Sequence, residues 1–400
     1  MQADYVVVGA GSAGCVVASR LSEAGASVIL LEAGPTDWYP WIHIPAAMRK
    51  LLRNPLVNWN YTTEPEPSSG GRNLDWPRGR TLGGTSSING MLYVRGAPAD
   101  FDGWAQMGAR GWSYDEVLPY FRKAETYAQK GDPEVRGQSG PLKVEDYRTI
   151  LPLTHRFVEA AQQAGFPFNP DLNGKQRYGV GYSQMTRRGR WRGSTAQTFL
   201  REARGRPNLR VETNAQSGKL LFTPGSTDPL RFGQLDRQPG MSCVVCVVKP
   251  DSRGTIMATS ADPFARPAIK PNYLTAHTDE LALLGGTRHV RRIFAAPALK
   301  QHSSGELQPG PDLQSDADLL AYARRAGNTL YHPVGTCKMG EDPRAVVDSR
   351  LRVRGIEGLR VIDASVMPTL TTGNTNAPTI MIGEKGAAMI LEDAGRQTPR

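Results

Sequence analysis

The sequence predicts an α/β protein with two parts, a Rossmann-like nucleotide-binding domain and a smaller α+β domain whose sheet is mainly antiparallel. A glycine fingerprint lies between two short apolar runs near the N-terminus. Strand-like runs and amphipathic segments follow in the middle of the chain, apart from that fingerprint. The chain has 400 residues, which is more than one hydrophobic core usually organises.

The fingerprint is Gly9-x-Gly11-x-x-Gly14, directly after the apolar run at 5–8. A helical pattern follows, and then a second buried-strand pattern at 26–31 that ends at Glu32. Such glycines permit a tight turn and close approach of the backbone to a pyrophosphate, which the helix N-terminus faces. Glu32 is placed to accept a hydrogen bond from a ribose hydroxyl. These residues predict a dinucleotide, without deciding between FAD and NAD.

A second glycine-rich segment, Pro77 to Gly96, is dense in glycine and small hydroxyl residues. Such a loop lets the backbone approach a flat or anionic ligand. An ordinary surface loop of the same composition is the alternative.

Near the C-terminus the run Tyr331 to Thr336 contains His332, and Asn376 follows 44 residues after that histidine. Imidazole suits proton transfer near neutral pH, and an asparagine amide supplies donors without charge. A single histidine is more often structural, and that interpretation applies to His43, His155, His277, His289 and His302. The segment after Asn376 is predicted to be a helix, with Pro378 near its start.

Several long motifs together resemble the glucose–methanol–choline (GMC) family of FAD-dependent alcohol oxidoreductases, and bacterial choline-dehydrogenase-like and aliphatic alcohol dehydrogenases in particular. The resemblance covers about residues 1–214 and 242–392. The matching motifs are the fingerprint, the loop 79–89, the run 331–336, the run 373–379, and the shorter segments 58–65 and 112–114.

The resemblance implies that FAD is bound noncovalently, because Ile88 stands where some members carry a histidine bonded to the flavin. It implies His332 as the base and Asn376 as the hydrogen-bond partner of the substrate oxygen, while flavin N5 accepts the hydride. The implied FAD-binding residues are Gly9, Gly11, Ser12, Ala13, Gly14, Glu32, Ala33, Arg80, Gly83, Gly84, Ser87, Asn89, Gly90, Met91, Asp363, Ala364, Asn374, Thr375, Asn376 and Pro378.

The implied activity is oxidation of a primary alcohol, choline-like or aliphatic/aromatic, to the aldehyde. The electron acceptor would be a quinone, an artificial dye or oxygen. The alternatives are a noncatalytic FAD-binding remnant, an oxygen-using alcohol oxidase, and a flavin lyase on the same fold. The remnant is an alternative because the family's next strand and its Gly-Ala…Ser-Gly-Ile-Gly signature are absent after Ala215. Well over a hundred residues of the family pattern are missing there.

The net charge of +10 is scattered along the chain, so no nucleic-acid partner is expected. The densest basic run, Arg187 to Arg192, is expected to be a solvated surface or a phosphate-facing loop; a peripheral membrane contact is the alternative. No apolar run reaches about 18 residues and no secretory signal is recognised. A cytoplasmic location is therefore expected, with peripheral attachment to the inner membrane as the alternative. The oligomeric state is left open.

The four cysteines, Cys15, Cys243, Cys246 and Cys337, fit a reducing compartment without disulfides. Cys243 and Cys246 have the spacing of a zinc or redox pair, but a second ligand pair is missing. We therefore expect no metal, and a buried structural role for both.

The predicted domains are discontinuous. The FAD-binding domain comprises 1–150, 200–225 and 340–400, and the substrate-binding domain comprises 151–199 and 240–339. The expected helices are 152–165, 194–203, 280–294 and 317–326, with Leu281, Leu283 and Leu284 as core candidates in the third. The expected strands are 243–248, 255–258 and one at Ile269.

Overall fold

The computed structural model describes residues 2–129, 131–215, 240–262 and 265–396. The N-terminal part forms a parallel sheet in the order β1-β2-β10, from strands β1 (Tyr5–Val8), β2 (Val28–Ala33) and β10 (Leu209–Ala215). Helix α1 (Ser12–Glu23) connects the first two strands. The predicted strand–turn–helix–strand unit is therefore confirmed.

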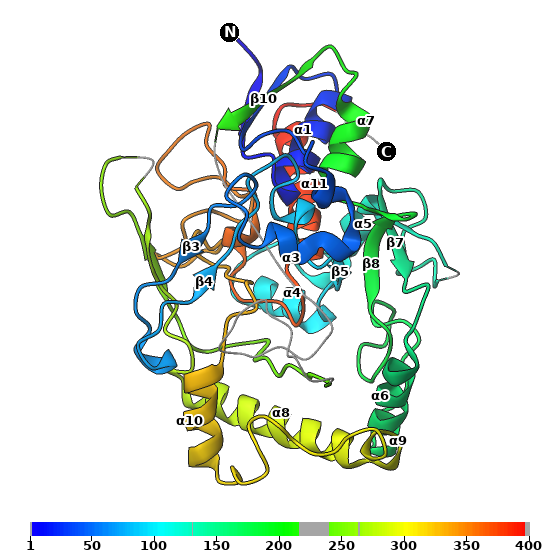
Figure 1. The fold of residues 1–400 in the computed structure, drawn as a ribbon. Coiled ribbons are helices and arrows are strands. Elements are labelled where there is room, and N and C mark those ends of the chain that lie inside the picture. Colours follow the sequence, from blue (N-terminus) through cyan, green and yellow to red (C-terminus); the bar gives the residue numbers. More distant parts are fainter. Residues whose placement is uncertain (1, 130, 216–239, 263–264, 397–400) are drawn as a thin grey trace.

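Helix α11 (Asn376–Asp393), near the end of the chain, lies beside α1 (Figure 1). Close approach is possible because a methyl group at Gly383 would already lie 3.1 Å from the carbonyl oxygen of Ala13. Arg20 of α1 also forms a buried ion pair with Glu384 of α11, at 2.8 Å. The two ends of the chain therefore build one structural unit. The predicted helix begins at Asn376, two residues before Pro378.

The first strand of this sheet is unusually open. Val6 is 58% exposed and Val8 is 82% exposed, and β1 stands at the edge of the sheet. Strands of parallel sheets are normally covered on both faces. Among the described residues, this part of the sheet lacks such cover.

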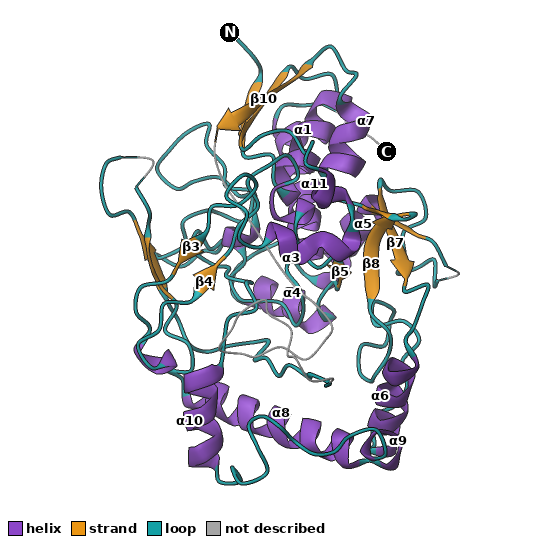
Figure 2. Cartoon of the chain, in the orientation of Figure 1, coloured by secondary structure: helices purple, strands orange, loops and turns teal. Residues whose placement is uncertain are grey.

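A second sheet has the order β5-β8-β7-β6, with β9 paired to β8 (Figure 2). Its strands are β5 (Leu92–Tyr93), β6 (Glu125–Tyr127), β7 (Leu142–Asp146), β8 (Gln184–Arg188) and β9 (Trp191–Arg192). Every pair is antiparallel except β6 with β7. The predicted mainly antiparallel sheet is confirmed, and its strands come from both sides of the predicted boundary at residue 150; the division into domains stays a prediction.

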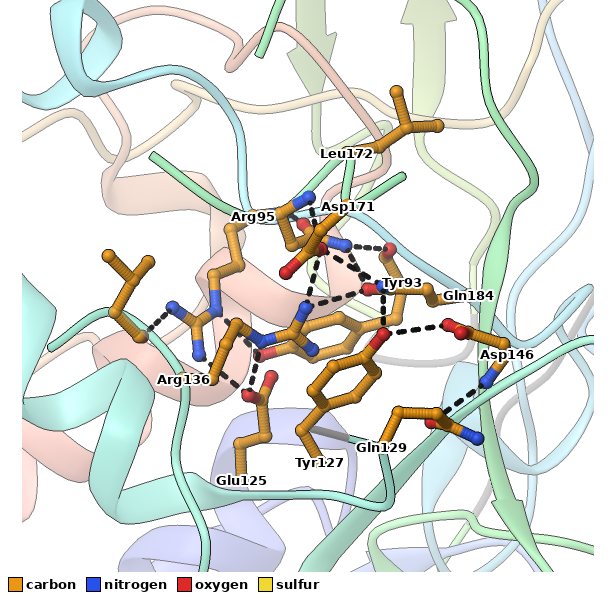
Figure 3. A network of polar contacts seen from close by, with 12 residues as sticks. Tyr93, Arg95, Glu125, Tyr127, Gln129, Arg136, Asp146, Asp171, Leu172 and Gln184 are labelled. Carbon is orange, nitrogen blue, oxygen red and sulfur yellow. Dashed lines mark hydrogen bonds and ion pairs between the residues drawn. The ribbon is translucent and has the colours of Figure 1, made fainter. Parts of the chain in front are cut away.

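A buried charge network fixes this sheet to the segment that leads out of the glycine-rich loop (Figure 3). Glu125 Oε1 lies 2.9 Å from Arg95 Nη2 and accepts from Arg136 Nε at 2.8 Å. Arg136 also pairs with Asp171 at 2.7 Å. The side chains of Arg95, Glu125 and Arg136 are at most 1% exposed. Burial raises the pKa of Glu125, but the two guanidinium charges outweigh it and hold that pKa below its usual range.

Helices α4 (Pro98–Gln106) and α5 (Tyr114–Ala124) pack in the main core, whereas α6, α8, α9 and α10 lie together at the bottom of Figure 1. Those four helices span Pro152–Gln163, His277–Ala295, Pro297–Lys300 and Asp316–Ala326. Two further antiparallel pairs join β3 (Tyr61–Thr62) to β4 (Asp75–Trp76) and β11 (Thr255–Met257) to β12 (Ala268–Lys270).

The shorter elements are α2 (Pro40–His43), α3 (Met48–Leu51), α7 (Arg201–Ala203), the 3-10 turns Pro45–Ala47, Pro67–Ser69, Gly84–Ser87 and Ala364–Val366, and a π-helical turn Ala196–Leu200. The last of these and α7 together take the place of the helix predicted at 194–203. The strands predicted around 255–258 and at Ile269 are confirmed, and they pair with each other.

Three predictions for the middle of the chain are wrong. The run 243–248 forms no strand, and Cys243 and Cys246 are exposed rather than buried, because this extended segment pairs with no described strand. In α8, Leu284 is buried but Leu281 is 53% exposed and Leu283 is half-buried, because the helix buries a narrower stripe than its leucines suggested. Most of the linking segment 216–241 lies outside the described residues, as does the end of the predicted 200–225 portion.

Candidate active site

The fingerprint glycines divide into two kinds. A methyl group at Gly14 would lie 1.9 Å from the carbonyl oxygen of Gly9, so Gly14 is required by packing inside the protein. At Gly9 and Gly11 a methyl group would meet no protein atom within 4 Å, and Gly9 has φ +92°. Helix α1 has no side-chain cap and no acidic residue in its first turn. Its first amides and the space above Gly11 therefore suit a phosphate group.

Glu32 is the last residue but one of β2 and lies beside this turn. Its Oε2 accepts from the backbone amide of Ala10 at 2.8 Å and its Oε1 from that of Gly34 at 2.9 Å. Burial raises the pKa of Glu32 to about 7, although these amide hydrogen bonds act to lower it. Each carboxylate oxygen can accept a second hydrogen bond. Glu32 therefore shapes the turn and still offers an acceptor to a ribose hydroxyl.

The second glycine-rich loop packs directly on the fingerprint. The amide of Gly83 donates to the carbonyl of Ala10 at 2.7 Å, and a methyl group at Gly84 would lie 2.7 Å from the Cα of Gly11. Ile88 is buried among apolar side chains, and its hydrocarbon side chain has no nucleophilic atom that could bond covalently to a cofactor. Two loops that are remote in sequence thus form one wall.

One cavity of 3210 Å³ connects the glycine loops with the C-terminal motifs. Most of the predicted site residues line it: Gly9, Gly11, Ser12, Ala13, Gly14, Glu32, Ala33, Gly84, Asn89, Gly90, Met91, His332, Asp363, Ala364, Asn374, Thr375 and Asn376. Arg80, Gly83, Ser87 and Pro378 lie behind its wall. Arg80 donates to Pro55 O and Ser87 to Leu82 O, so these two brace the loops from behind.

His332 is held at both ring nitrogens. Its Nε2 lies 2.9 Å from the Asn374 amide nitrogen, and its Nδ1 lies 3.1 Å from Thr375 Oγ1. With the amide donating, Nε2 is the unprotonated nitrogen and Nδ1–H donates to the threonine. Burial and the nearby charge of Arg78 lower the pKa of His332 to about 4. The imidazole is therefore neutral near pH 7, and its basic lone pair is the one on Nε2 that accepts from the Asn374 amide.

The two loop asparagines make different contacts. We predicted that Asn376 works beside His332, but in the structure the amide that contacts the imidazole is that of Asn374. Asn376 begins α11, and its Oδ1 accepts from the Ser12 hydroxyl at 2.7 Å. The distance of about 44 residues along the sequence does not show which of two asparagines, two positions apart at the start of a helix, contacts His332. The structure therefore gives the contact with the imidazole to a residue that we had predicted only as FAD-binding.

Two arginines near the site were missed. Arg192 belongs to the run predicted as a solvated surface or a phosphate-facing loop, yet it is 1% exposed and donates to Ile42 O at 2.8 Å and to Asn89 O at 2.6 Å. Burial lowers its pKa to about 9. Arg78 lines the cavity and faces the Tyr331 carbonyl at 3.4 Å. Arg192 was missed because four arginines within six residues look like an exposed run, and only packing shows that one of them points inward.

Comparison with known proteins identifies the family. Sequence models of the GMC oxidoreductase family match residues 3–257 and 250–383. An alcohol dehydrogenase (acceptor) of Pseudomonas putida is 32% identical over 526 aligned positions, covering 97% of this chain and 95% of that protein. Mitochondrial choline dehydrogenase of Mus musculus is 36% identical over 530 positions, covering 96% of this chain and 89% of that protein. The crystal structure of pyridoxine 4-oxidase from Mesorbium loti has a TM-score of 0.87 and 27% identity, covering 98% of this chain and 99% of the other.

The chain belongs to the GMC oxidoreductase family. The predicted class, an FAD-dependent oxidoreductase acting on CH–OH donors, is thereby confirmed, as is FAD as its cofactor. The residues present fit FAD: Gly11 leaves room for a phosphate at the start of α1, Glu32 offers an acceptor, and both stand on one cavity wall.

The internal loss is visible in the same comparison. The alignment with the Pseudomonas putida protein spans 526 positions against 400 residues here, so more than a hundred positions of that relative have no counterpart. The cavity of 3210 Å³ is several times the roughly 300–1,000 Å³ of ordinary ligand sites. That the loss falls after Ala215 stays a prediction.

Among the described residues, the structure has no helix that combines the length and the apolar character needed to cross a membrane.

Proposed function

We propose that this protein oxidises a primary alcohol to the aldehyde, with His332 as the base and Asn374 as the donor to the substrate oxygen. The observation that carries the proposal is the 2.9 Å contact between Asn374 Nδ2 and His332 Nε2 in the cavity wall. The contact supports the proposal because a neutral proton acceptor and an amide donor lie side by side, an arrangement that suits removal of the proton from an alcohol hydroxyl.

The chemistry removes two hydrogens from the alcohol. The hydroxyl proton goes to His332 Nε2, the hydride leaves the carbon, and the bonding electrons of the O–H bond form the C=O bond. FAD, when bound, supplies the acceptor of that hydride. In this proposal the alcohol hydroxyl takes the place of the Asn374 amide on Nε2, and the amide then donates to the substrate oxygen. Thr375 accepts from Nδ1–H and so fixes the orientation of the ring.

Choline-like and aliphatic or aromatic alcohols are the proposed substrate class. Relatives named for alcohol and choline support it. Trp59 and Tyr61 line the cavity and stack with ring centroids 5.2 Å apart, and Trp76 also lines it. Aromatic faces of this kind attract the ammonium group of a choline-like alcohol. The proposed acceptor of the electrons is a quinone, an artificial dye or oxygen.

A second candidate is an FAD-binding protein without turnover. The high exposure of Val6 and Val8 and the alignment positions without a counterpart favour it, because they leave one side of the cofactor domain uncovered. Anaerobic addition of alcohols to the FAD-loaded protein separates the two functions. Bleaching of the flavin absorbance supports alcohol oxidation, and bound flavin that no alcohol bleaches supports the second candidate.

A further inference from the structure

The loop that carries Asn374 is held from behind by one carboxylate, that of Asp100 on α4. The Asp100 side chain is fully buried. Its Oδ2 accepts three hydrogen bonds of 2.8 Å, from the Ala97 amide, the Thr372 amide and the Thr372 hydroxyl. One oxygen atom thus fixes both the backbone and the side chain of Thr372, two residues before Asn374. Hydrogen bonds to a charged acceptor are roughly twice as strong as neutral ones.

Ordinary helix capping explains only part of this arrangement. Asp100 is the third residue of α4, and a carboxylate there commonly returns to the amide that precedes the helix, here that of Ala97. The two bonds from Thr372 reach a segment more than 270 residues away in sequence. One turn further along α4, the Trp104 indole donates to Thr369 O at 3.2 Å. Helix α4 therefore forms hydrogen bonds with this loop at two positions, Thr369 and Thr372.

The loop has little room to move on this side. A methyl group at Gly373 would lie 2.4 Å from Val94 Cγ1, and one at Gly96 would lie 2.9 Å from Asp100 Oδ2. The backbone at Gly96 and at Gly373 is thus in direct contact with neighbouring side chains, and no space is left between them. A displacement of Thr372 would be passed directly to Asn374.

The other oxygen of Asp100 is tied to a different part of the cavity wall. Asp100 Oδ1 lies 2.7 Å from Lys249 Nζ. Lys249 directly follows the run 242–248, which lines the cavity. The ion pair with Lys249 therefore joins the buried carboxylate of Asp100 to this second part of the cavity wall.

We propose that Asp100 is a positioning residue for alcohol oxidation, which keeps Asn374 within hydrogen-bond distance of His332 by holding Thr372. The proposal rests on the proposed function of His332 and Asn374. Asp100 itself lies behind the cavity wall, whereas Thr372 and Asn374 line it. A displacement of about 1 Å in a reacting group can lower a rate by about 100-fold, so a contact one step removed from the site has a measurable effect.

The test uses Thr372→Val, which replaces the hydroxyl with a methyl group of similar size, and Thr372→Ser, which retains the hydroxyl. In the FAD-loaded protein, Thr372→Val is expected to lower the limiting rate of flavin reduction by about 10- to 100-fold, with little change in the apparent Kd for the alcohol. Thr372→Ser is expected to stay close to wild type. Asp100→Ala should lower the limiting rate of flavin reduction more than Thr372→Val does. If Asp100→Ala does not fold, the result for Thr372→Val alone decides whether the proposal holds.

Asp102→Ala is the matched control, because Asp102 lies on the same helix and accepts from the Tyr114 amide at 2.9 Å. It is expected to leave the limiting rate unchanged. Equal losses in Asp102→Ala and Thr372→Val would show a general effect on α4 and would overturn the proposal.

Hydrogen exchange of the amides in 369–376 is the readout that needs no turnover. Faster exchange in Thr372→Val but not in Thr372→Ser supports the holding role of Asp100. If no alcohol reduces the wild-type flavin, the proposed function fails while the exchange result still decides whether Asp100 holds the loop. Unchanged exchange together with a wild-type reduction rate in Thr372→Val overturns the proposal.

Discussion

The Ser12 hydroxyl donates a hydrogen bond to Asn376 Oδ1 across 2.7 Å, and these two residues are 364 positions apart in the sequence. Ser12 is the first residue of α1 and Asn376 is the first residue of α11. Two helix N-termini therefore meet at one point of the cavity wall, where their positive ends add. The fingerprint is thereby joined to the loop that carries Asn374, the residue in contact with His332.

The two loop asparagines are expected to differ in function. Asn374→Ala removes the amide that contacts His332, so it should slow flavin reduction by an alcohol by about 10- to 1,000-fold and leave FAD bound. Asn376→Ala removes the acceptor of Ser12 and should weaken FAD binding more than it slows reduction. Rapid-mixing absorbance and FAD titration measure the two effects. A larger loss of reduction rate in Asn376→Ala would return the substrate role to Asn376.

His332→Ala should lower the rate of flavin reduction by about two to four orders of magnitude, the usual contribution of a general base. FAD binding should be retained, because the fingerprint residues are not altered. His302→Ala, at an exposed position, is the control. Reduction of His332→Ala at the wild-type rate would exclude the imidazole as the base.

The pH dependence should be that of a histidine with a strongly lowered pKa. Because the unprotonated imidazole is the active form, activity is lost as pH falls through its pKa. Burial places that pKa at about 4 rather than near its usual value of 6.5. The kcat/KM for the alcohol should therefore stay level from pH 8 to about 5 and decline below that, provided that FAD stays bound. A decline centred on pH 6.5 would mean that His332 is solvated in the working enzyme.

The fingerprint glycines offer a matched pair of variants. Gly14→Ala places a methyl group 1.9 Å from Gly9 O and should destabilise the fold by about 1–3 kcal/mol or more. Gly11→Ala meets no protein atom within 4 Å, so stability should be unchanged while the Kd for FAD rises at least about tenfold. Thermal denaturation of the FAD-free protein and FAD titration separate the two. Normal FAD affinity in Gly11→Ala would place the pyrophosphate elsewhere.

The buried network of Figure 3 should contribute strongly to stability. Glu125→Gln leaves the guanidinium groups of Arg95 and Arg136 buried with less compensation, and a loss of about 3–5 kcal/mol is expected in urea denaturation. The exposed pair Arg53–Asp75 is the comparison, because Arg53→Ala should cost only about 0–1 kcal/mol. A similar loss of unfolding free energy in Glu125→Gln and Arg53→Ala would mean that water reaches the network and screens its charges.

The sequence predicted what depends on local pattern. The turn at Gly9–Gly14 and the strand ending at Glu32 follow from residue order alone, as does the helix after Asn376. It could not assign the partner of His332, because Asn374 and Asn376 differ only in how the loop enters α11. It also failed at 243–248, where an apolar run resembles a strand but finds no described neighbour. The side chain of Arg192 points inward because it donates to the carbonyl of Asn89, and a contact between residues so far apart cannot be deduced from the order of residues around Arg192.

The decisive measurement is the visible spectrum of the FAD-loaded protein, recorded before and after anaerobic addition of choline and a panel of primary alcohols. If His332 is the base for alcohol oxidation, one class of alcohol bleaches the flavin spectrum of the wild-type protein, and the spectrum of His332→Ala stays unbleached on the same timescale. Bound flavin that no alcohol bleaches in the wild-type protein would exclude alcohol oxidation as its function.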